Sequence, residues 1–270
     1  MKQGSLYEAL FQIGTLIFVI IIVHATYVTV IRPNAELIQE QQQLMQEQNP
    51  DIVPERSVFI IVRDYEQEFC IIFFLWAVTI IGMKTQHTLR QRALLERTLV
   101  QLQDGMSILP EDSRNYARPV QALGPKEKEF LLPRALLAGL HRFQSTQNIH
   151  AVSSIIKDTC ETEADRMETE LSIVRYIAWA IPSIGFLGTV RGIGTALGQA
   201  YQAVAGDIAG VTQSLGVAFN STFVALVVSI FLMFLLHQLQ LQQDRLVLDC
   251  QNYCDERLIR HMQVPEKANS

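Results

Sequence analysis

Three hydroxyl side chains in the second half of the chain lie in segments that are apolar enough to cross a membrane. Thr189 lies in the segment 176–200, and Ser221 and Thr222 lie in the segment 211–236, which has no charged residue. Two antiparallel membrane helices would bring the two threonines to similar depths near the middle of the bilayer. Polar groups at that depth are costly and mark candidate ion pathways. We therefore predict that these three hydroxyls line a path for an ion.

Small residues form a stripe beside the threonines when both segments are drawn as helices with 3.6 residues per turn. The stripe contains Gly185, Gly188, Gly192 and Ala196 in the first segment and Ser214, Ala218 and Ala225 in the second. Close helix packing explains such a stripe, because small residues let helix backbones approach each other in lipid. A narrow hydrated path, or the seat of another helix, also explains it and accounts for hydroxyls at one depth. We predict that the stripe faces a pore and contacts a partner, and the packing interpretation stays open.

Arg191 is the only charged residue in these two segments, and it lies away from the centre of the small stripe. Arg191 and Asn220 are candidates for contact with a neighbouring subunit or a partner, and pairing of Arg191 with an acid or with carbonyl groups of a neighbouring subunit is one form of this. A proton path needs a group that binds and releases the proton. Because the two segments lack one, we expect it on a partner. His24, in the first apolar segment, is either a relay or a neutral imidazole that faces the protein interior.

Four segments have the length and composition of membrane spans, since about 20 apolar residues in a helix cross a hydrocarbon core of roughly 30 Å. They are residues 9–31, 67–85, 176–200 and 211–236. The second is the shortest uncharged run and spans if Lys84 extends its amine to the headgroups. A signal peptide is the alternative for the first run, but no small-residue cleavage site follows it. Because 49% of the residues are hydrophobic and only 18% are charged, a membrane protein fits better than one soluble core.

Charge placement predicts which ends of the spans face the cytoplasm. The segment 84–175 contains 13 Lys and Arg residues, whereas 32–68 contains three against eight acids. The excess of positive charge places 84–175 and both termini in the cytoplasm. The segment 32–66, which includes a glutamine-rich run, is then an outside loop.

We predict an all-α fold: a polytopic membrane protein with about four transmembrane helices, the last two extended into a cytoplasmic helical bundle. The expected parts are N-terminal membrane helices with the outside loop (1–83), a cytoplasmic helical region (84–175), a channel helix pair (176–236), and a cytoplasmic C-terminal helix and tail (237–270). Within the cytoplasmic region, the stretch 109–133 is marked by Pro and Gly residues.

Several classes of function are disfavoured. Net charge is about −5 and no cluster of Lys and Arg occurs, so nucleic acid is not an expected partner. The four cysteines are too scattered for a disulfide framework, and Cys250 and Cys254, which share a helix face, are expected to be buried thiols rather than metal ligands. No nucleophile is paired with a base and no Walker loop occurs. We therefore expect no enzyme activity, no cofactor and no metal.

The order "PSIGFLGTVRGI" at 182–193, followed about thirty residues later by "VAFNSTFVALVVSI" at 217–230, resembles the MotA/TolQ/ExbB proton-channel family over roughly residues 150–262. The resemblance implies a bacterial inner-membrane homopentamer around a dimer of a single-span MotB/TolR/ExbD-like subunit, whose intramembrane aspartate carries the ion. It also implies that Thr189 and Thr222 are the two channel threonines and that Pro182 kinks its helix. Two positions depart from the family pattern. Val217 stands where some members carry a glutamate, and Arg191 stands where many have an apolar residue.

The predicted function is that of a ring-forming channel subunit of a motor driven by protons or sodium ions, which couples ion flow to rotation or force on the single-span partner. A self-contained transporter is one alternative, disfavoured by the missing intramembrane acids. A membrane scaffold with a cytoplasmic interaction bundle is the other, and it leaves the paired threonines unexplained. The choice of ion and the machine that the motor drives stay open.

Overall fold

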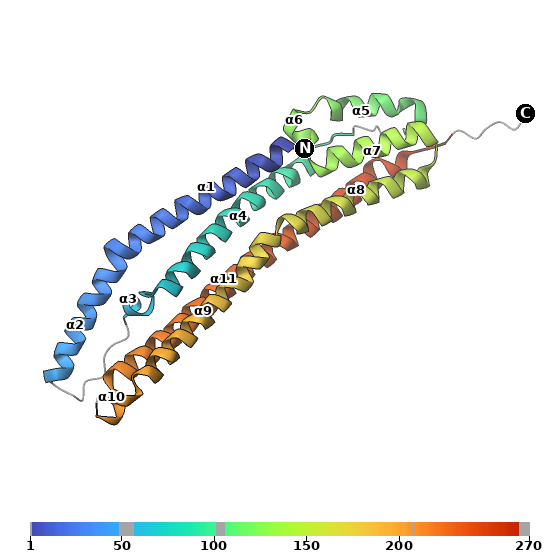
Figure 1. The fold of residues 1–270 in the computed structure, drawn as a ribbon. Coiled ribbons are helices and arrows are strands. Elements are labelled where there is room, and N and C mark those ends of the chain that lie inside the picture. The colour runs from blue at the N-terminus through green and yellow to red at the C-terminus, as the bar shows by residue number, and fades with distance from the viewer. Residues whose placement is uncertain (1, 49–56, 101–105, 207, 265–270) are drawn as a thin grey trace, which may run out of the picture. The chain divides into compact units, whose positions relative to one another are not determined.

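The computed structural model describes residues 2–48, 57–100, 106–206 and 208–264, and within these ranges every regular element is a helix and no β-strand occurs (Figure 1). The predicted all-α class is confirmed. The helices are α1 (Lys2–Thr26), a π-helical turn (Tyr27–Ile31), α2 (Arg32–Gln48), α3 (Val58–Ile61), α4 (Tyr65–Leu95), α5 (Ser113–Gln121), α6 (Pro125–Lys128), α7 (Leu131–Thr146), α8 (Ile149–Glu170), α9 (Ser172–Gly198), α10 (Ala200–Val204) and α11 (Ala209–Arg257), with 3-10 turns at Pro110–Asp112 and Ile259–His261.

Four helical stretches are long and apolar enough to cross a membrane, which confirms the predicted number. They are Leu10–Gln42, Tyr65–Leu95, Ile149–Gly198 and Ala209–His261. Each stretch is longer than the span predicted for it, because α1, α4, α9 and α11 continue into polar sequence without a helix-breaking signal.

The segment expected to be an outside loop is largely helical. The first helix passes through the π-helical turn and continues as α2 to Gln48, and α3 follows after residues that lie outside the described part of the chain. Gln, Glu, Leu and Met in this segment all have good helix propensity, which explains why the helix does not stop at the end of the apolar run. The π-helical turn lies directly before Pro33, whose missing N–H disturbs a regular helix at that point.

The Pro- and Gly-marked segment 109–133 contains the short helices α5 and α6. Pro110 begins the 3-10 turn that precedes α5, and Pro125 begins α6, positions where the missing N–H costs nothing. These two prolines therefore mark the starts of short helical segments.

The chain divides into two compact units. The first contains residues 1–82 and 173–236, and the second contains 83–172 and 237–270. The helices α4 and α11 contribute to both units, and each unit is described by itself.

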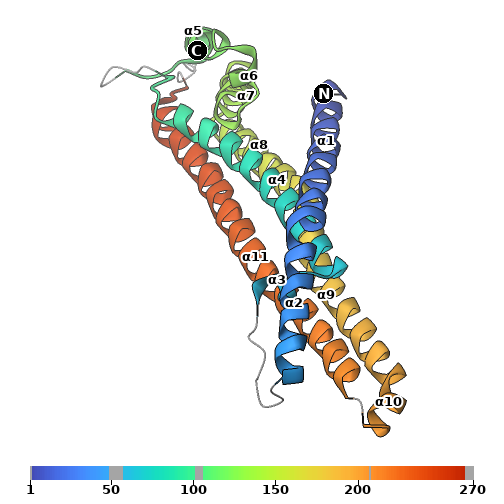
Figure 2. The same cartoon turned by 90° about the vertical axis from the view of Figure 1, so that its left-hand side faces the viewer.

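The first unit contains two packed helix pairs. In one, α1 lies beside α4. Buried Val23 of α1 and Tyr27 of the π-helical turn pack with Ile72 of α4, and the Trp76 indole N–H donates to the Gln12 carbonyl at 3.1 Å. In the other, α9 runs beside α11, and α10 lies at the end of that pair (Figures 1 and 2). This second pair contains all the residues of the predicted ion path.

The helices α9 and α11 approach closely because glycines of α9 face small residues of α11. A Cβ added to Gly192 would lie 2.7 Å from the Cβ and 2.8 Å from the backbone N of Ala218, and 2.8 Å from the carbonyl oxygen of Ser214. Gly185 contacts Ala225 in the same way about two turns away. Backbone atoms on the facing helix cannot move aside, so these positions accept no side chain.

The second unit has a continuous apolar core formed by α7, α8, the C-terminal part of α11 and the segments beside them. Gly139 of α7 lies against Ile156 of α8 and Leu258, where a Cβ would be 2.9 Å from the Ile156 Cδ1. The backbone around Ile108 bonds to the segment after α11, since its N–H donates to His261 and its carbonyl accepts from Gln263. The end of α11 is therefore held to the segment that precedes α5.

Two glycine-to-alanine substitutions in α9 test the close packing of α9 against α11. We expect Gly192→Ala to lower the free energy of unfolding by about 1–3 kcal/mol, because it forces α9 and α11 apart. Gly194→Ala, with no atom within 4 Å of its added Cβ, should leave stability equal or raise it by up to about 1 kcal/mol. Reversible unfolding in mixed micelles measures both. Equal effects of the two substitutions would contradict the observed packing.

Candidate functional site

The two predicted channel threonines are in contact with each other. Their hydroxyl oxygens lie within hydrogen-bond distance, the Thr189 hydroxyl donates to the Ala218 carbonyl at 3.1 Å, and the Thr222 hydroxyl donates to the Gly185 carbonyl at 3.2 Å. Each hydroxyl has a single proton, so a bond between the two hydroxyls replaces one of the bonds to a carbonyl. The pair is therefore a hydroxyl contact between α9 and α11 with more than one possible proton arrangement.

The small residues of the predicted stripe face the opposite helix of the same chain. Gly185, Gly188, Gly192, Ala196, Ser214, Ala218 and Ala225 are all buried. The space beside the glycines is filled by α11, as the packing interpretation predicts. That the stripe also borders a pore and contacts a partner in an assembly stays a prediction. Thr189 and Thr222 are less buried and lie at the edge of the packed surface.

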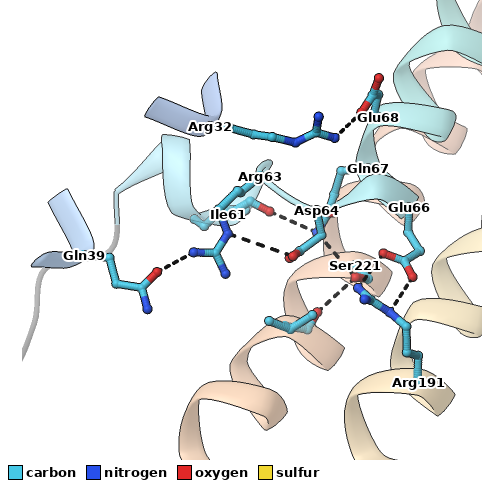
Figure 3. Close-up of polar contacts among 11 residues, drawn as sticks. Arg32, Gln39, Ile61, Arg63, Asp64, Glu66, Gln67, Glu68, Arg191 and Ser221 are labelled. Carbon is cyan, nitrogen blue, oxygen red and sulfur yellow. Dashed lines mark hydrogen bonds and ion pairs between the residues drawn. The ribbon is translucent and has the colours of Figure 1, made fainter. Parts of the chain in front are cut away.

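Ser221 is buried, and its hydroxyl connects α11 to the start of α4. The hydroxyl donates to the Val217 carbonyl at 3.0 Å and accepts from the Gln67 side-chain amide at 3.3 Å. The same amide nitrogen donates to the Ile61 carbonyl at 3.1 Å (Figure 3). Gln67 therefore joins α3, α4 and α11 through one side chain.

Pro182 lies inside α9, and α11 compensates for its missing N–H. In a regular helix the carbonyl of Ala178 would accept from residue 182, which is a proline here. The Ser229 hydroxyl of α11 donates to this carbonyl at 3.3 Å. Within a bilayer a freed carbonyl must find a partner in the protein, and Ser229 supplies it.

Arg191 forms an ion pair within its own chain. Its Nε and one terminal nitrogen lie 2.7 and 2.8 Å from the two carboxylate oxygens of Glu66, at the start of α4 (Figure 3). The predicted pairing with an acid is observed, but the acid belongs to the same chain rather than to a neighbouring subunit. Glu66 also lies against Gly188, where its Cγ would be 3.2 Å from an added Cβ. The ion pair therefore fastens α4 onto α9 next to Thr189.

A second carboxylate at the start of α4 binds two groups from the first helix. Glu68 is buried, accepts a hydrogen bond from Arg32, and lies 2.7 Å from His24 Nδ1. The His24 side chain is largely exposed, but its Nδ1 faces the buried Glu68 carboxylate, so both interpretations of His24 stay predictions. These contacts join α1 and α2 to α4.

The third carboxylate near α4 belongs to Asp64. The Nε of Arg63 lies 3.9 Å from its Oδ1, and Arg63 also donates to Gln39 (Figure 3). Burial raises the pKa of the Asp64 carboxyl above its ordinary value, against the opposing effect of the Arg63 and Arg191 guanidinium groups.

Asn220, a predicted contact residue, lines a cavity of about 460 Å³ between α2, α3 and the start of α11. Arg63, Gln39 and Gln213 line the same cavity. Asn220 thus faces polar groups of its own chain.

Residues 127–252 match the model of the MotA/TolQ/ExbB proton channel family. The predicted resemblance to this family is confirmed over these residues. The match begins and ends earlier than the predicted 150–262, and it includes both threonines, Pro182 and Arg191. No curated protein and no solved structure matches the chain significantly. The MotA/TolQ/ExbB family consists of membrane subunits of proton channels in ion-driven motors.

The carboxylates and Gln67 at the start of α4 lie outside the segment 127–252 that matches the family, and no functional role was predicted for them from the sequence. One signal for them was present: the polar run "DYEQE" at 64–68 directly precedes an apolar span. Its contact with α9 and α11 could not be derived from spacing, because it joins positions more than one hundred residues apart.

Pro182 and Ser229 in the MotA/TolQ/ExbB segment can be tested as a pair. We expect Ser229→Ala to lower the free energy of unfolding by about 1 kcal/mol, because the Ala178 carbonyl loses its partner. In a Pro182→Ala background the new backbone N–H can bond to that carbonyl, so Ser229→Ala should then have little effect. A double-mutant cycle of unfolding measures the difference. The same loss in both backgrounds would show that Ser229 acts elsewhere.

The contribution of the Arg191–Glu66 ion pair to stability can be tested separately. We expect Arg191→Leu to lower the free energy of unfolding by about 1 kcal/mol, a modest value because the Arg191 side chain is half exposed. Exchanging the charges, as Arg191→Glu with Glu66→Arg, should recover most of the loss. Unfolding measurements check both variants. Unchanged stability together with altered ion selectivity would instead assign Arg191 to the ion path.

Proposed function

We propose that the chain is the ring-forming channel subunit of an ion-driven motor in the bacterial inner membrane. Ion flow would pass between this subunit and a single-span MotB/TolR/ExbD-like partner and would drive rotation or force on that partner. Both termini and the second unit would lie in the cytoplasm, in agreement with the excess of Lys and Arg in 84–175.

The observation that carries the proposal is the contact between the Thr189 and Thr222 hydroxyls inside a segment of the proton-channel family. Close packing of α9 and α11 requires small residues, but it does not require two hydroxyls to meet at one depth. The interhelical hydroxyl pair, with carbonyl groups of both helices beside it, suits transient bonding to a passing proton or sodium ion.

The assembly proposed is a homopentamer around two copies of the partner, embedded in the lipid bilayer. Exposed apolar side chains on α9 and α11 support contact with lipid and with further helices; Trp179, Phe186, Leu187, Phe219, Phe223 and Ile230 are among them. α9 and α11 carry no carboxylate near the threonine pair in the described part of the chain. An aspartate on the partner's span would supply the group that carries the ion past the threonines.

Valine substitutions test the hydroxyls directly, since valine keeps the branched shape and removes the oxygen. We expect Thr189→Val and Thr222→Val each to reduce ion-driven flux to background while the complex still assembles. The measurement is flux into proteoliposomes that contain the co-purified complex, under an imposed potential. Thr195→Val is the matched control, because Thr195 is an exposed threonine of α9 that bonds only to the Arg191 carbonyl.

Native mass spectrometry of each variant reports whether assembly is retained. Five copies with two of a small subunit in all variants, together with loss of flux only in the two channel variants, would support the proposal. Full flux in both channel variants would remove the channel role of the threonines. A monomer or dimer without a small partner would contradict the motor assembly itself.

A further inference from the structure

Three carboxylates lie within five residues at the start of α4, and two of them are paired with cations from other helices. Glu66 binds Arg191 of α9 through both oxygens, and Glu68 binds Arg32. Asp64 differs from them. Its Arg63 contact is at 3.9 Å, too long for a hydrogen bond, and its other oxygen, Oδ2, is buried with no hydrogen-bond partner among the described residues.

Gln67, one helical turn after Asp64, has a second buried acceptor without a partner. The Gln67 side chain is 0% exposed, and its amide nitrogen donates to Ile61 and Ser221. Its Oε1 is buried and accepts no hydrogen bond from the described part of the chain. Asp64 directly precedes α4 and Gln67 lies three residues later, so the two side chains leave the backbone on the same side of the helix start.

Helix capping does not account for Asp64. An aspartate directly before a helix usually accepts hydrogen bonds from backbone N–H groups of the first turn. The Asp64 carboxylate makes none of these bonds to described residues, although its backbone carbonyl accepts from the Glu68 N–H at 3.2 Å. A buried carboxylate oxygen without a hydrogen-bond donor is unfavourable, because it has lost its contact with water. Two such acceptors together point to a missing donor or cation.

We propose that Asp64 and Gln67 form a binding site for a monovalent cation on this chain, which takes up the transported ion next to Ser221. The ion is either a proton carried on the Asp64 carboxylate or a sodium ion held by the Asp64 and Gln67 oxygens with water. A proton on Asp64 would supply a donor to the site, and a sodium ion would be coordinated by oxygen atoms, which hard cations prefer. The role in transport rests on the function proposed above, whereas binding itself does not.

The site is connected to the threonine pair by hydrogen-bonding groups. Gln67 bonds through its nitrogen to the Ser221 hydroxyl, and Ser221 directly precedes Thr222, whose hydroxyl contacts Thr189 (Figure 3 shows Gln67, Asp64 and Ser221 together). An ion bound at Asp64 is therefore one side chain away from α11 and from the start of the predicted path. This provides a carboxylate from the chain itself, which α9 and α11 do not contain near the threonines.

The charges around Asp64 permit it to hold a proton. Burial favours the neutral carboxyl and raises its pKa, and Glu66 acts in the same direction. The guanidinium groups of Arg63, Arg191 and Arg32 oppose this. Because the folded-state pKa is raised above the unfolded value, Asp64 should bind its proton at higher pH than an exposed aspartate, and its deprotonation should destabilise the fold as pH rises.

The test uses the full chain in lipid nanodiscs, so it does not depend on a partner or on flux. Infrared difference spectra over a pH titration report a protonated carboxyl group. Thermal unfolding in sodium chloride against choline chloride reports sodium binding. Two variants change the site: Asp64→Asn, and Gln67→Glu, which keeps a side-chain oxygen that can accept a hydrogen bond. The control is Asp255→Asn, because Asp255 is an exposed aspartate paired with Arg260.

A titrating carboxyl band that disappears in Asp64→Asn and persists in Asp255→Asn identifies the ion as a proton. A sodium-dependent rise in unfolding temperature that is lost in Asp64→Asn and altered in Gln67→Glu identifies it as sodium. The proposal is overturned if the wild-type chain shows neither signal, or if the signal survives in Asp64→Asn. If Asp64→Asn does not fold, loss or change of the signal in folded Gln67→Glu supports the site, and an unchanged signal overturns it.

The outcome separates this site from the proposed motor. Ion binding to a chain that shows no ion-driven flux with any partner would support the site and contradict the motor. Flux that depends on Thr189 and Thr222 but not on Asp64, with no binding signal, would support the motor and contradict the site.

Discussion

The close approach of α9 and α11 is the constraint on which the candidate site depends. Gly185 and Gly192 bring the two backbones near enough that a side chain at either position would meet atoms of the facing helix. At this separation, threonine side chains at the same level must touch, and each hydroxyl reaches a carbonyl of the opposite helix. A wider pair would leave these hydroxyls bonded only to their own helices, as other exposed threonines of this chain are.

The close approach of α9 and α11 also lets α11 replace the backbone hydrogen bond that Pro182 removes from α9. The Ala178 carbonyl loses its helical partner, and only a donor on an adjacent helix can replace it where water is excluded. Ser229 reaches it because the helices are in contact at that level as well. Small polar residues along α11 thus have different partners at successive levels. Ser229 bonds to the carbonyl freed by Pro182, Thr222 contacts Thr189, and Ser221 bonds to Gln67 of α4.

The start of α4 adds charge to a helix pair that has almost none. Three acidic residues and Gln67 project toward neighbouring helices there, and two of the acids are neutralised by Arg191 and Arg32. Partly buried charges of this kind are stable only when they are paired, so the pairing determines where α4 lies against α9. Asp64 does not follow this pattern, which makes it the one acid in the group with unused capacity to bind a cation.

The sequence by itself determined the fold class, the four apolar helices, the family and the threonines as candidates. These follow from local properties: run length, helical period, and a motif order contained in adjacent segments. It also located Ser221 and Arg191, but it did not decide between the two interpretations of the small stripe and did not identify Glu66 as the acid that pairs with Arg191. Helical period shows which residues share a face, and it does not show what covers that face.

Only the tertiary structure decided which residues these side chains contact. The stripe is covered by α11 of the same chain, Ser229 compensates for Pro182, and the polar run at 64–68 lies on the helix pair. Each of these contacts joins residues far apart along the chain, where no spacing rule applies. The physical reason is that buried polar groups must be satisfied wherever a suitable group lies nearby in space, and that neighbour is set by packing of whole helices rather than by local sequence.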